Sequence, residues 1–367
     1  MTSLDEIIEA HRIVLCCGSG GVGKTTSAAA VAIHGAQRGR KAVVVTIDPA
    51  RRLADALGLA GLTNEPQKIE GPWDGELWAL MLDTKSTFDA LIATHATDDE
   101  QRQRILDNRF YRNISGALSG TQEYMAMEML FDLHENTDVD LIIVDTPPSR
   151  NALDFLDAPL RLTRFLEHRL YRIVTAPTRG IVRAAGFAAQ AFFRTVSKVV
   201  GGEVIGDAIA FFQAFDGMEE GFRERAHKVY ELLGSATTAF LIVTSARADA
   251  IDEAVFFAEK LRESDMVLTA VIANRLHPYA GTTDIAGLRA RAEELGEAPL
   301  GQLYRAFADG ERLASTERTL LNPMRTVVAP VPVFEVDQLP FDVHDIPTLD
   351  AFGTILFGEQ ALLGDQA

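Results

Sequence analysis

Residues 18–25 read Gly18-Ser19-Gly20-Gly21-Val22-Gly23-Lys24-Thr25, and this segment is the strongest indication of the fold. It fits the pattern GxxxxGK[ST] and lies between an apolar run at Arg12–Cys17 and an alanine-rich helical pattern. In such a loop, backbone N–H groups curl around phosphate oxygens, the lysine neutralises the β- and γ-phosphates, and the hydroxyl ligates Mg²⁺. The sequence therefore predicts a nucleotide site built on Lys24 and Thr25.

Short apolar runs alternate with helical patterns along the rest of the chain. Several runs are continuously apolar, which is typical of strands buried on both faces of a parallel sheet. Strands separated by helices indicate a doubly wound, mostly parallel α/β fold of the P-loop NTPase class. We expect strands at Arg12–Cys17, Lys41–Ile47, Leu77–Leu82, Asp140–Asp145, Ala239–Thr244, Leu268–Asn274 and Thr326–Val331.

Two helical insertions interrupt this alternation, at about Ser86–His134 and Ala152–Leu233. We expect residues 1–151 and 234–367 to form the nucleotide-binding domain and residues 152–233 to form an inserted helical subdomain. Between Pro159 and Gly202 there are eight Arg or Lys residues against one acid, Glu167. The insertion is either a helical hairpin packed on its own domain or an apolar groove with a basic rim for a hydrophobic or lipidic client.

Composition narrows the choice of partners and compartment. The 367 residues carry 35 Lys plus Arg against 52 Asp plus Glu, a net charge of −17, which disfavours specific nucleic-acid binding. The two cysteines, Cys16 and Cys17, are adjacent and predict no structural disulfide. No signal peptide and no apolar run of spanning length is evident. We expect a cytoplasmic protein with at most peripheral membrane contact.

Two further segments, which contain Asp48 and Asp145, each follow a predicted strand. Both are suited to contact the γ-phosphate of a bound nucleotide or its Mg²⁺. Asp145 ends an apolar strand, from which a carboxylate can hold Mg²⁺ through water. Asp48 follows another strand and can orient the attacking water. Asp48 and Asp55 could instead merely cap a helix, but three such segments in order at strand ends favour the catalytic interpretation.

These segments resemble the phosphate loop, switch I and switch II of the arsenical-pump ATPase family. That family includes the guided-entry ATPase for tail-anchored membrane proteins and belongs to the class of MinD- and ParA-like ATPases. The resemblance resumes at Ile272-Ala273-Asn274-Arg275, where the family has an asparagine that reads adenine, and at Pro332.

The resemblance implies an ATP- and Mg²⁺-dependent hydrolase that closes as a dimer over nucleotide and opens a helical client surface. Asp48 would polarise the lytic water with Lys24 as the other catalytic residue, Thr25 and Asp145 would serve the metal, and Asn274 and Pro332 would contact adenine. The phosphates of ATP would be bound by Gly20, Gly21, Val22, Gly23, Lys24, Thr25 and Thr26.

The sequence departs from the family pattern at Ser19, where the family usually has a lysine that reaches the partner's nucleotide. Either Arg51, Arg52 or Arg150 replaces that cation, or a related subunit in a heteromer supplies it. No cysteine beyond Cys16 and Cys17 exists to form the family's zinc or arsenite sites, so arsenite pumping is not expected.

Three functions remain open. The first is an ATPase whose cycle opens and closes a hydrophobic client surface, hence a targeting factor or chaperone. The second is a ParA- or MinD-like positioning ATPase that uses the basic stretch as its contact surface. The third is a regulatory subunit that binds ATP but hydrolyses it only within a heteromer.

Overall fold

The computed structural model describes residues 3–48, 51–114, 121–147, 202–282 and 284–358. The chain divides into two compact units, one of residues Met1–Met81, Thr137–Leu153 and Gly234–Ala367, the other of Leu82–Asn136 and Asp154–Leu233. The predicted boundaries around residues 152–233 stay a prediction, because most of this segment, including its basic stretch, lies outside the described residues.

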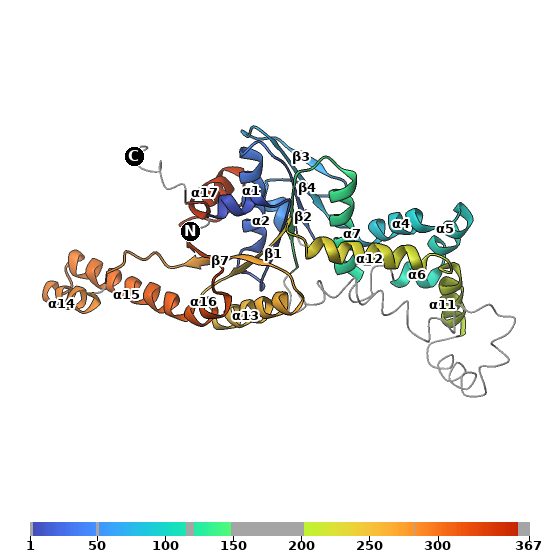
Figure 1. Cartoon of the computed structure of the whole chain (residues 1–367). Coiled ribbons are helices and arrows are strands. Elements are labelled where there is room, and N and C mark those ends of the chain that lie inside the picture. Colours follow the sequence, from blue (N-terminus) through green and yellow to red (C-terminus); the bar gives the residue numbers. More distant parts are fainter. Residues whose placement is uncertain (1–2, 49–50, 115–120, 148–201, 283, 359–367) are drawn as a thin grey trace, which may run out of the picture. The chain divides into compact units, whose positions relative to one another are not determined.

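The first unit is built on an eight-stranded sheet with the order β3-β4-β2-β5-β1-β6-β7-β8. All neighbouring strands are parallel except β3 and β4. This confirms the predicted doubly wound, mostly parallel α/β fold (Figure 1). The strands are β1 (Ile13–Cys17), β2 (Lys41–Thr46), β3 (Gln67–Ile69), β4 (Glu76–Met81), β5 (Leu141–Asp145), β6 (Thr238–Thr244), β7 (Leu268–Leu276) and β8 (Val333–Asp337).

The direction in which the chain adds strands to the sheet reverses at β1. From β1 the chain first adds β2 on one side, whereas β6, β7 and β8 follow on the other. Every residue of β1, β5 and β6 is buried, as their continuous apolar runs predict. Ligands of such folds bind outside the carboxyl ends of the strands at this reversal, which directs attention to the ends of β1 and β5.

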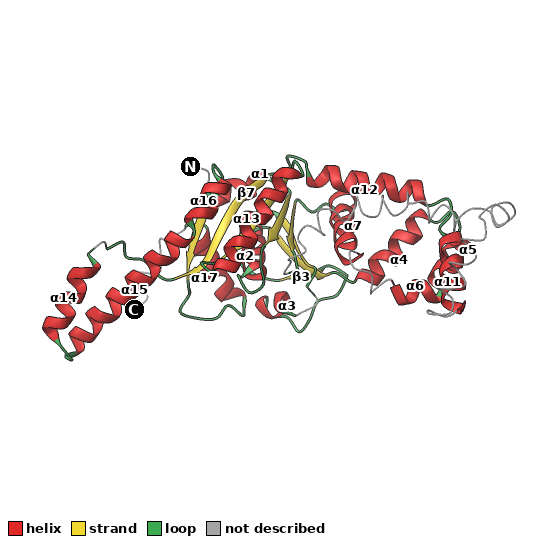
Figure 2. Ribbon diagram, turned by 90° about the horizontal axis from the view of Figure 1, so that it is seen from below, coloured by secondary structure: helices red, strands yellow, loops and turns green. Residues whose placement is uncertain are grey.

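Helices cover both faces of the sheet, because right-handed crossovers in opposite directions place their helices on opposite sides. The helices α1, α2 and α17 pack together, and α13 packs on α16 (Figure 1). The helices α14 and α15 form a hairpin that extends away from the sheet (Figure 2). The helices of this unit are α1 (Leu4–Ala10), α2 (Lys24–Gln37), α3 (Arg52–Ala56), α13 (Ala248–Glu263), α14 (Ile285–Leu295), α15 (Pro299–Leu320), α16 (Asn322–Val328) and α17 (Ile346–Leu356).

The last expected strand, Thr326–Val331, is wrong. Residues 322–328 form α16, which has a proline in its first turn, and the final strand starts only at Val333. Proline is favoured at a helix start, and the buried residues Met324 and Val328 pack the helix, so tertiary contacts override the β-branched character of Thr326-Val327-Val328.

The second unit is helical in its described part, which confirms a helical insertion between the third and fourth predicted strands. Its core includes a cluster of aromatic rings in which Phe211 stacks on Tyr111 with centroids 5.9 Å apart. A buried ion pair joins Arg225 to Glu128 at 2.7 Å. Its described helices are α4 (Thr84–His95), α5 (Asp99–Leu106), α6 (Arg109–Ile114), α7 (Thr121–Asn136), α11 (Gly202–Ala214) and α12 (Glu219–Leu233).

None of the helices in the described ranges is both long enough and apolar enough to cross a membrane.

Candidate nucleotide site

The phosphate loop connects β1 to α2, and its glycines are required by geometry. Gly18 has φ +144°, and a Cβ there would lie 2.0 Å from the Val243 carbonyl oxygen. Gly23 caps α2 with φ +98°, and its Cβ would lie 2.3 Å from Asn274 Nδ2. Only glycine fits such positions without displacing backbone or a buried amide. The loop thus packs closely against Val243 in β6 and Asn274 in β7, and the N-terminus of α2 faces the site.

Lys24 is buried in this loop. Its Nζ donates a hydrogen bond to the backbone oxygen of Ser19 at 2.7 Å, so the ammonium group is held by the loop itself. Burial lowers the pKa of Lys24, and the nearby Asp145 carboxylate opposes that shift. A partly desolvated cation within a ring of backbone groups is well placed to bind phosphate oxygens.

Asp145 meets the loop at the adjacent end of β5. Thr25 Oγ1 and Thr46 Oγ1 donate hydrogen bonds to Asp145 Oδ2 at 2.8 and 3.1 Å. Asp145 Oδ1 is buried and accepts no hydrogen bond within the described part of the chain. Burial raises the pKa of Asp145 to about 6, although the two hydroxyls and Lys24 counteract part of this effect.

The donor set at this point fits Mg²⁺. A free buried carboxylate oxygen beside the Thr25 hydroxyl can bind a hydrated cation directly or through water. The described residues contain no group of three or more His, Cys, Asp or Glu side chains that could hold a metal. Magnesium bound with nucleotide needs no such group, because waters and phosphate oxygens fill most of its coordination sphere.

Asp48 lies two residues beyond β2, beside Asp145 across the sheet edge. Its N–H donates to Thr46 Oγ1 at 3.3 Å, and the N–H of Ile47 donates to the backbone oxygen of Asp145 at 3.1 Å. The carboxylate is half-buried and lies 3.4 Å from Arg52. The sequence-predicted Lys24, Thr25, Asp48 and Asp145 therefore gather at one edge of the sheet.

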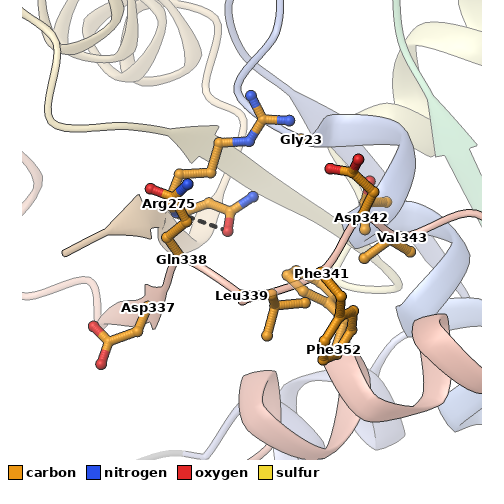
Figure 3. A pocket seen from close by; sticks show the side chains of 11 residues that line it. Gly23, Arg275, Asp337, Gln338, Leu339, Phe341, Asp342, Val343 and Phe352 are labelled. Atoms are coloured by element: carbon orange, nitrogen blue, oxygen red, sulfur yellow. Dashed lines mark hydrogen bonds between the residues drawn. The ribbon is translucent and has the colours of Figure 1, made fainter. Parts of the chain in front are cut away.

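A cavity of about 620 Å³ adjoins the other side of the loop. Gly23, Thr26 and Asn274 line it, so the predicted phosphate and adenine residues face a common space (Figure 3). Asn274 is buried, donates from Nδ2 to the Val22 backbone oxygen at 2.9 Å and accepts the Arg275 N–H at Oδ1. The rest of the lining is Arg275, Asp337, Gln338, Leu339, Phe341, Asp342, Val343 and Phe352.

The position predicted for Pro332, after the last strand, is wrong. Pro332 precedes β8, and its carbonyl oxygen accepts the N–H of Val271 within β7, so it lies at the amino end of β8 and not at the carboxyl ends that adjoin the phosphate loop. The segment that follows the last strand is 338–345, which carries a different proline, Pro340. The apolar and polar residues of Val333-Phe334-Glu335-Val336, followed by Pro340, were the signal that could have located the last strand.

Comparison with known proteins agrees with this geometry. The family model for anion-transporting ATPases matches residues 11–315, which covers the chain from β1 into α15. The chain belongs to the anion-transporting ATPase family. The match ends before β8, so the lining residues 337–339, 341–343 and Phe352 lie beyond it.

Relatives of this family member include ATPase GET3 of Kluyveromyces lactis, 29% identical over 169 residues, which are 43% of this chain and 48% of the relative. ATPase GET3 of Malassezia globosa is 30% identical over 153 residues, 42% of this chain and 44% of the relative. ATPase ARSA1 of Chlamydomonas reinhardtii is 28% identical over 296 residues, 75% of this chain and 36% of the relative. The chain thus spans less than half the length of these curated relatives.

In this member of the anion-transporting ATPase family, Ser19 is buried at the second position of the loop. Among the arginines considered as replacements for the usual lysine, Arg52 pairs with Asp48, Arg51 is the N-cap residue of α3, and Arg150 lies outside the described residues. Sequence reasoning missed Arg275, whose Nη1 donates to the Gly21 backbone oxygen at 2.8 Å. Its position directly after Asn274 was the available signal.

Proposed function

We propose that this protein is a Mg²⁺-dependent ATPase. The observation that carries the proposal is the contact between Thr25 Oγ1 and Asp145 Oδ2, which leaves the second carboxylate oxygen buried beside the phosphate loop without a hydrogen bond in the described structure. A buried carboxylate oxygen without a hydrogen-bond partner is costly, and a bound cation would satisfy Asp145 Oδ1. Family membership supports the same conclusion.

Each residue of the site has a distinct task in this proposal. Backbone N–H groups of the loop and Lys24 bind the phosphates, while Thr25 and Asp145 hold Mg²⁺, which supplies positive charge to the phosphate oxygens. Asp48 orients the attacking water and polarises it by accepting a hydrogen bond from it. Asn274 and the cavity beside it receive the base.

We infer further that the nucleotide cycle opens and closes a dimer bearing a hydrophobic helical client surface. The partner is a second copy or a related subunit that supplies the missing lysine. The relatives named ATPase GET3 and the size of the helical unit support this assignment. Phe215 is buried in that unit and is not part of a client surface, whereas Phe212 is half-buried beside Phe110.

Phosphate release from Mg-ATP, measured over a range of protein concentrations, tests the enzyme and the assembly together. Turnover per chain that rises with concentration is expected of a self-sufficient homodimer. Tight ATP binding with negligible turnover at every concentration favours the regulatory subunit instead. A protein that neither binds nor hydrolyses Mg-ATP contradicts the proposal.

Replacement of Phe192, Phe193 and Phe212 by Asp tests the client surface; the first two lie outside the described residues. We expect loss of bound hydrophobic client with ATP turnover retained. Retention of client by the triple variant rules out the surface. For the competing ParA- or MinD-like function, co-sedimentation with DNA or anionic liposomes at low salt should succeed and weaken steeply as salt rises.

We do not propose arsenite transport, because the two cysteines of the sequence are poorly suited to bind arsenite. Cys16 and Cys17 are both buried in β1, and burial raises the pKa of the Cys17 thiol to about 12. A thiolate is the form that binds a soft metalloid, so these two side chains act as packing residues.

A further inference from the structure

Two consecutive residues at the end of β7 hold two consecutive carbonyl groups of the phosphate loop. Arg275 Nη1 donates to the Gly21 oxygen at 2.8 Å, and Asn274 Nδ2 donates to the Val22 oxygen at 2.9 Å. The two donors are themselves linked, since the Arg275 N–H donates to Asn274 Oδ1 at 2.9 Å (Figure 3). The end of β7 therefore fixes the orientation of two neighbouring peptide groups.

Peptide geometry gives this arrangement a consequence for phosphate binding. In a trans peptide the carbonyl oxygen and the amide hydrogen point in opposite directions. With the Gly21 and Val22 oxygens turned toward β7, the N–H groups of Val22 and Gly23 point the other way. Successive N–H groups that converge in this manner form an anion-binding concavity.

The backbone at Arg275 is strained in a way that favours this contact. Arg275 has φ +61°, a left-handed conformation that is unusual for a residue with a side chain. Its side chain is exposed, and its guanidinium donates to the Gly21 backbone oxygen. A strained residue whose cation rests on a loop carbonyl is more consistent with a role in ligand binding than with one in stability.

We propose that Arg275 is a positioning residue for the nucleotide phosphates, which rests on the ATPase function proposed above. Its guanidinium holds the Gly21–Val22 peptide in the binding orientation and polarises it, so that the Val22 N–H becomes a stronger donor. The chain thereby places a cation of its own on a loop whose second residue, Ser19, is uncharged and buried. The nucleotide class it serves is di- and triphosphates, because their β-phosphate lies within such a loop.

The test is the affinity for Mg-ADP, measured by titration calorimetry on the full chain. Arg275→Met removes the donor and the charge and should weaken binding by about tenfold or more, the range of one charge-assisted hydrogen bond. Arg275→Lys keeps a charged donor and should recover most of that loss. Arg289→Gln on α14, whose arginine pairs with Asp309 away from the loop, is the matched control and should bind like the wild type.

Thermal unfolding without nucleotide separates this role from a structural one. The midpoint of thermal unfolding should be equal in the wild type and in Arg275→Met, because the Arg275 side chain is exposed and its replacement removes no buried contact. Equal Mg-ADP affinity in the wild type and Arg275→Met, or a loss that Arg275→Lys does not reduce, overturns the inference and leaves the ATPase proposal intact. A wild type that binds no Mg-nucleotide overturns both.

Discussion

The two ends of the candidate site are built in opposite ways. At the metal end, Lys24 and Asp145 are almost fully buried. Lys24 donates to the backbone oxygen of Ser19, and Asp145 accepts hydrogen bonds from two threonine hydroxyls. At the base end, the lining comes from the ends of β7 and β8 and from α17, and it includes Phe341, which is 42% exposed. The residues that we propose to bind phosphate and Mg²⁺ thus lie in the core, whereas those that we propose to receive the base include side chains near the surface.

This difference has an electrostatic counterpart. Burial raises the pKa of Asp145 to about 6 and lowers that of Lys24, so both groups depend on the site around them for their charged forms. The base end has apolar side chains in one part of its lining and Arg275 and Asp342 in another (Figure 3). Changes at the metal end should therefore have large effects on binding, and changes at the base end smaller ones.

Lys24→Ala should give the largest effect. Loss of the ammonium removes the charge that faces the β- and γ-phosphates, and we expect Mg-ATP affinity to fall by a hundredfold or more, an order-of-magnitude value for a buried charge-assisted contact. Titration calorimetry measures it. Lys68→Ala, an exposed lysine paired with Glu76, is the control and should retain wild-type affinity. Retained affinity in Lys24→Ala would remove the metal end from the site.

Asp145→Asn should have the next largest effect. It should weaken the binding of Mg²⁺ with nucleotide and increase the free energy of unfolding. Affinity for Mg²⁺ with nucleotide should fall by roughly ten- to a hundredfold. Without nucleotide, the folded carboxyl keeps its proton up to about pH 6, whereas the unfolded chain releases it near its ordinary value of 3.8. The free energy of unfolding should therefore fall as pH rises between about 4 and 6, and the full penalty persists above pH 6.

The amide side chain of Asp145→Asn removes that penalty. The free energy of unfolding at pH 7.5 should increase by up to about 3 kcal/mol over the wild type and much less at pH 4, an order-of-magnitude figure from the shift to about 6. Denaturant unfolding at the two pH values measures it. The control is Asp138→Asn, an exposed carboxyl whose pKa is lowered by Lys41, which should give no such gain. An equal gain at both pH values would contradict the assignment.

Phe341→Ala should give the smallest effect, because the ring is partly exposed and the other apolar side chains of the cavity lining, such as Leu339 and Phe352, are unchanged. We expect Mg-ADP affinity to fall by about two- to tenfold, as for the loss of one aromatic contact. Phe256→Ala on α13 removes a ring of 47% exposure that does not line the cavity, and it should leave affinity unchanged. An unchanged Phe341→Ala would show that the base binds elsewhere.

The metal end could be predicted from the sequence because its determinants are local. Gly23, Lys24 and Thr25 belong to one motif, and a continuous apolar run ending in Asp145 indicates a buried parallel strand. Their meeting follows from topology, since carboxyl ends of parallel strands lie at one edge. The distances from these side chains to the carbonyl groups of the loop, by contrast, depend on tertiary packing, which no local sequence pattern predicts.

The base end could be predicted only in part: Thr26 and Asn274 were expected to contact nucleotide and line the cavity, whereas the lining that follows β8 was not expected. Thr326-Val327-Val328 has the composition of a strand but forms the end of α16, and this error displaced the last strand and the loop after it. The contact of Arg275 with Gly21 joins residues 254 positions apart in the chain. In the helical unit, the contact of the Phe211 ring with Tyr111 likewise depends on long-range packing, which the helical spacing of apolar residues does not predict.

Asp48→Asn is the decisive test of ATP hydrolysis at this site, because it separates the hydrolysis step from nucleotide binding. Mg-ATP affinity and phosphate release should be measured on the same preparations of wild type and variant. We predict affinity within about threefold of the wild type and a loss of turnover of roughly a hundredfold or more, since the change removes water activation and leaves Lys24, Thr25 and Asp145 in place. Loss of affinity in parallel with turnover, or turnover equal to that of the wild type, would contradict the role of Asp48 and the account of this edge as an ATP-hydrolysing site.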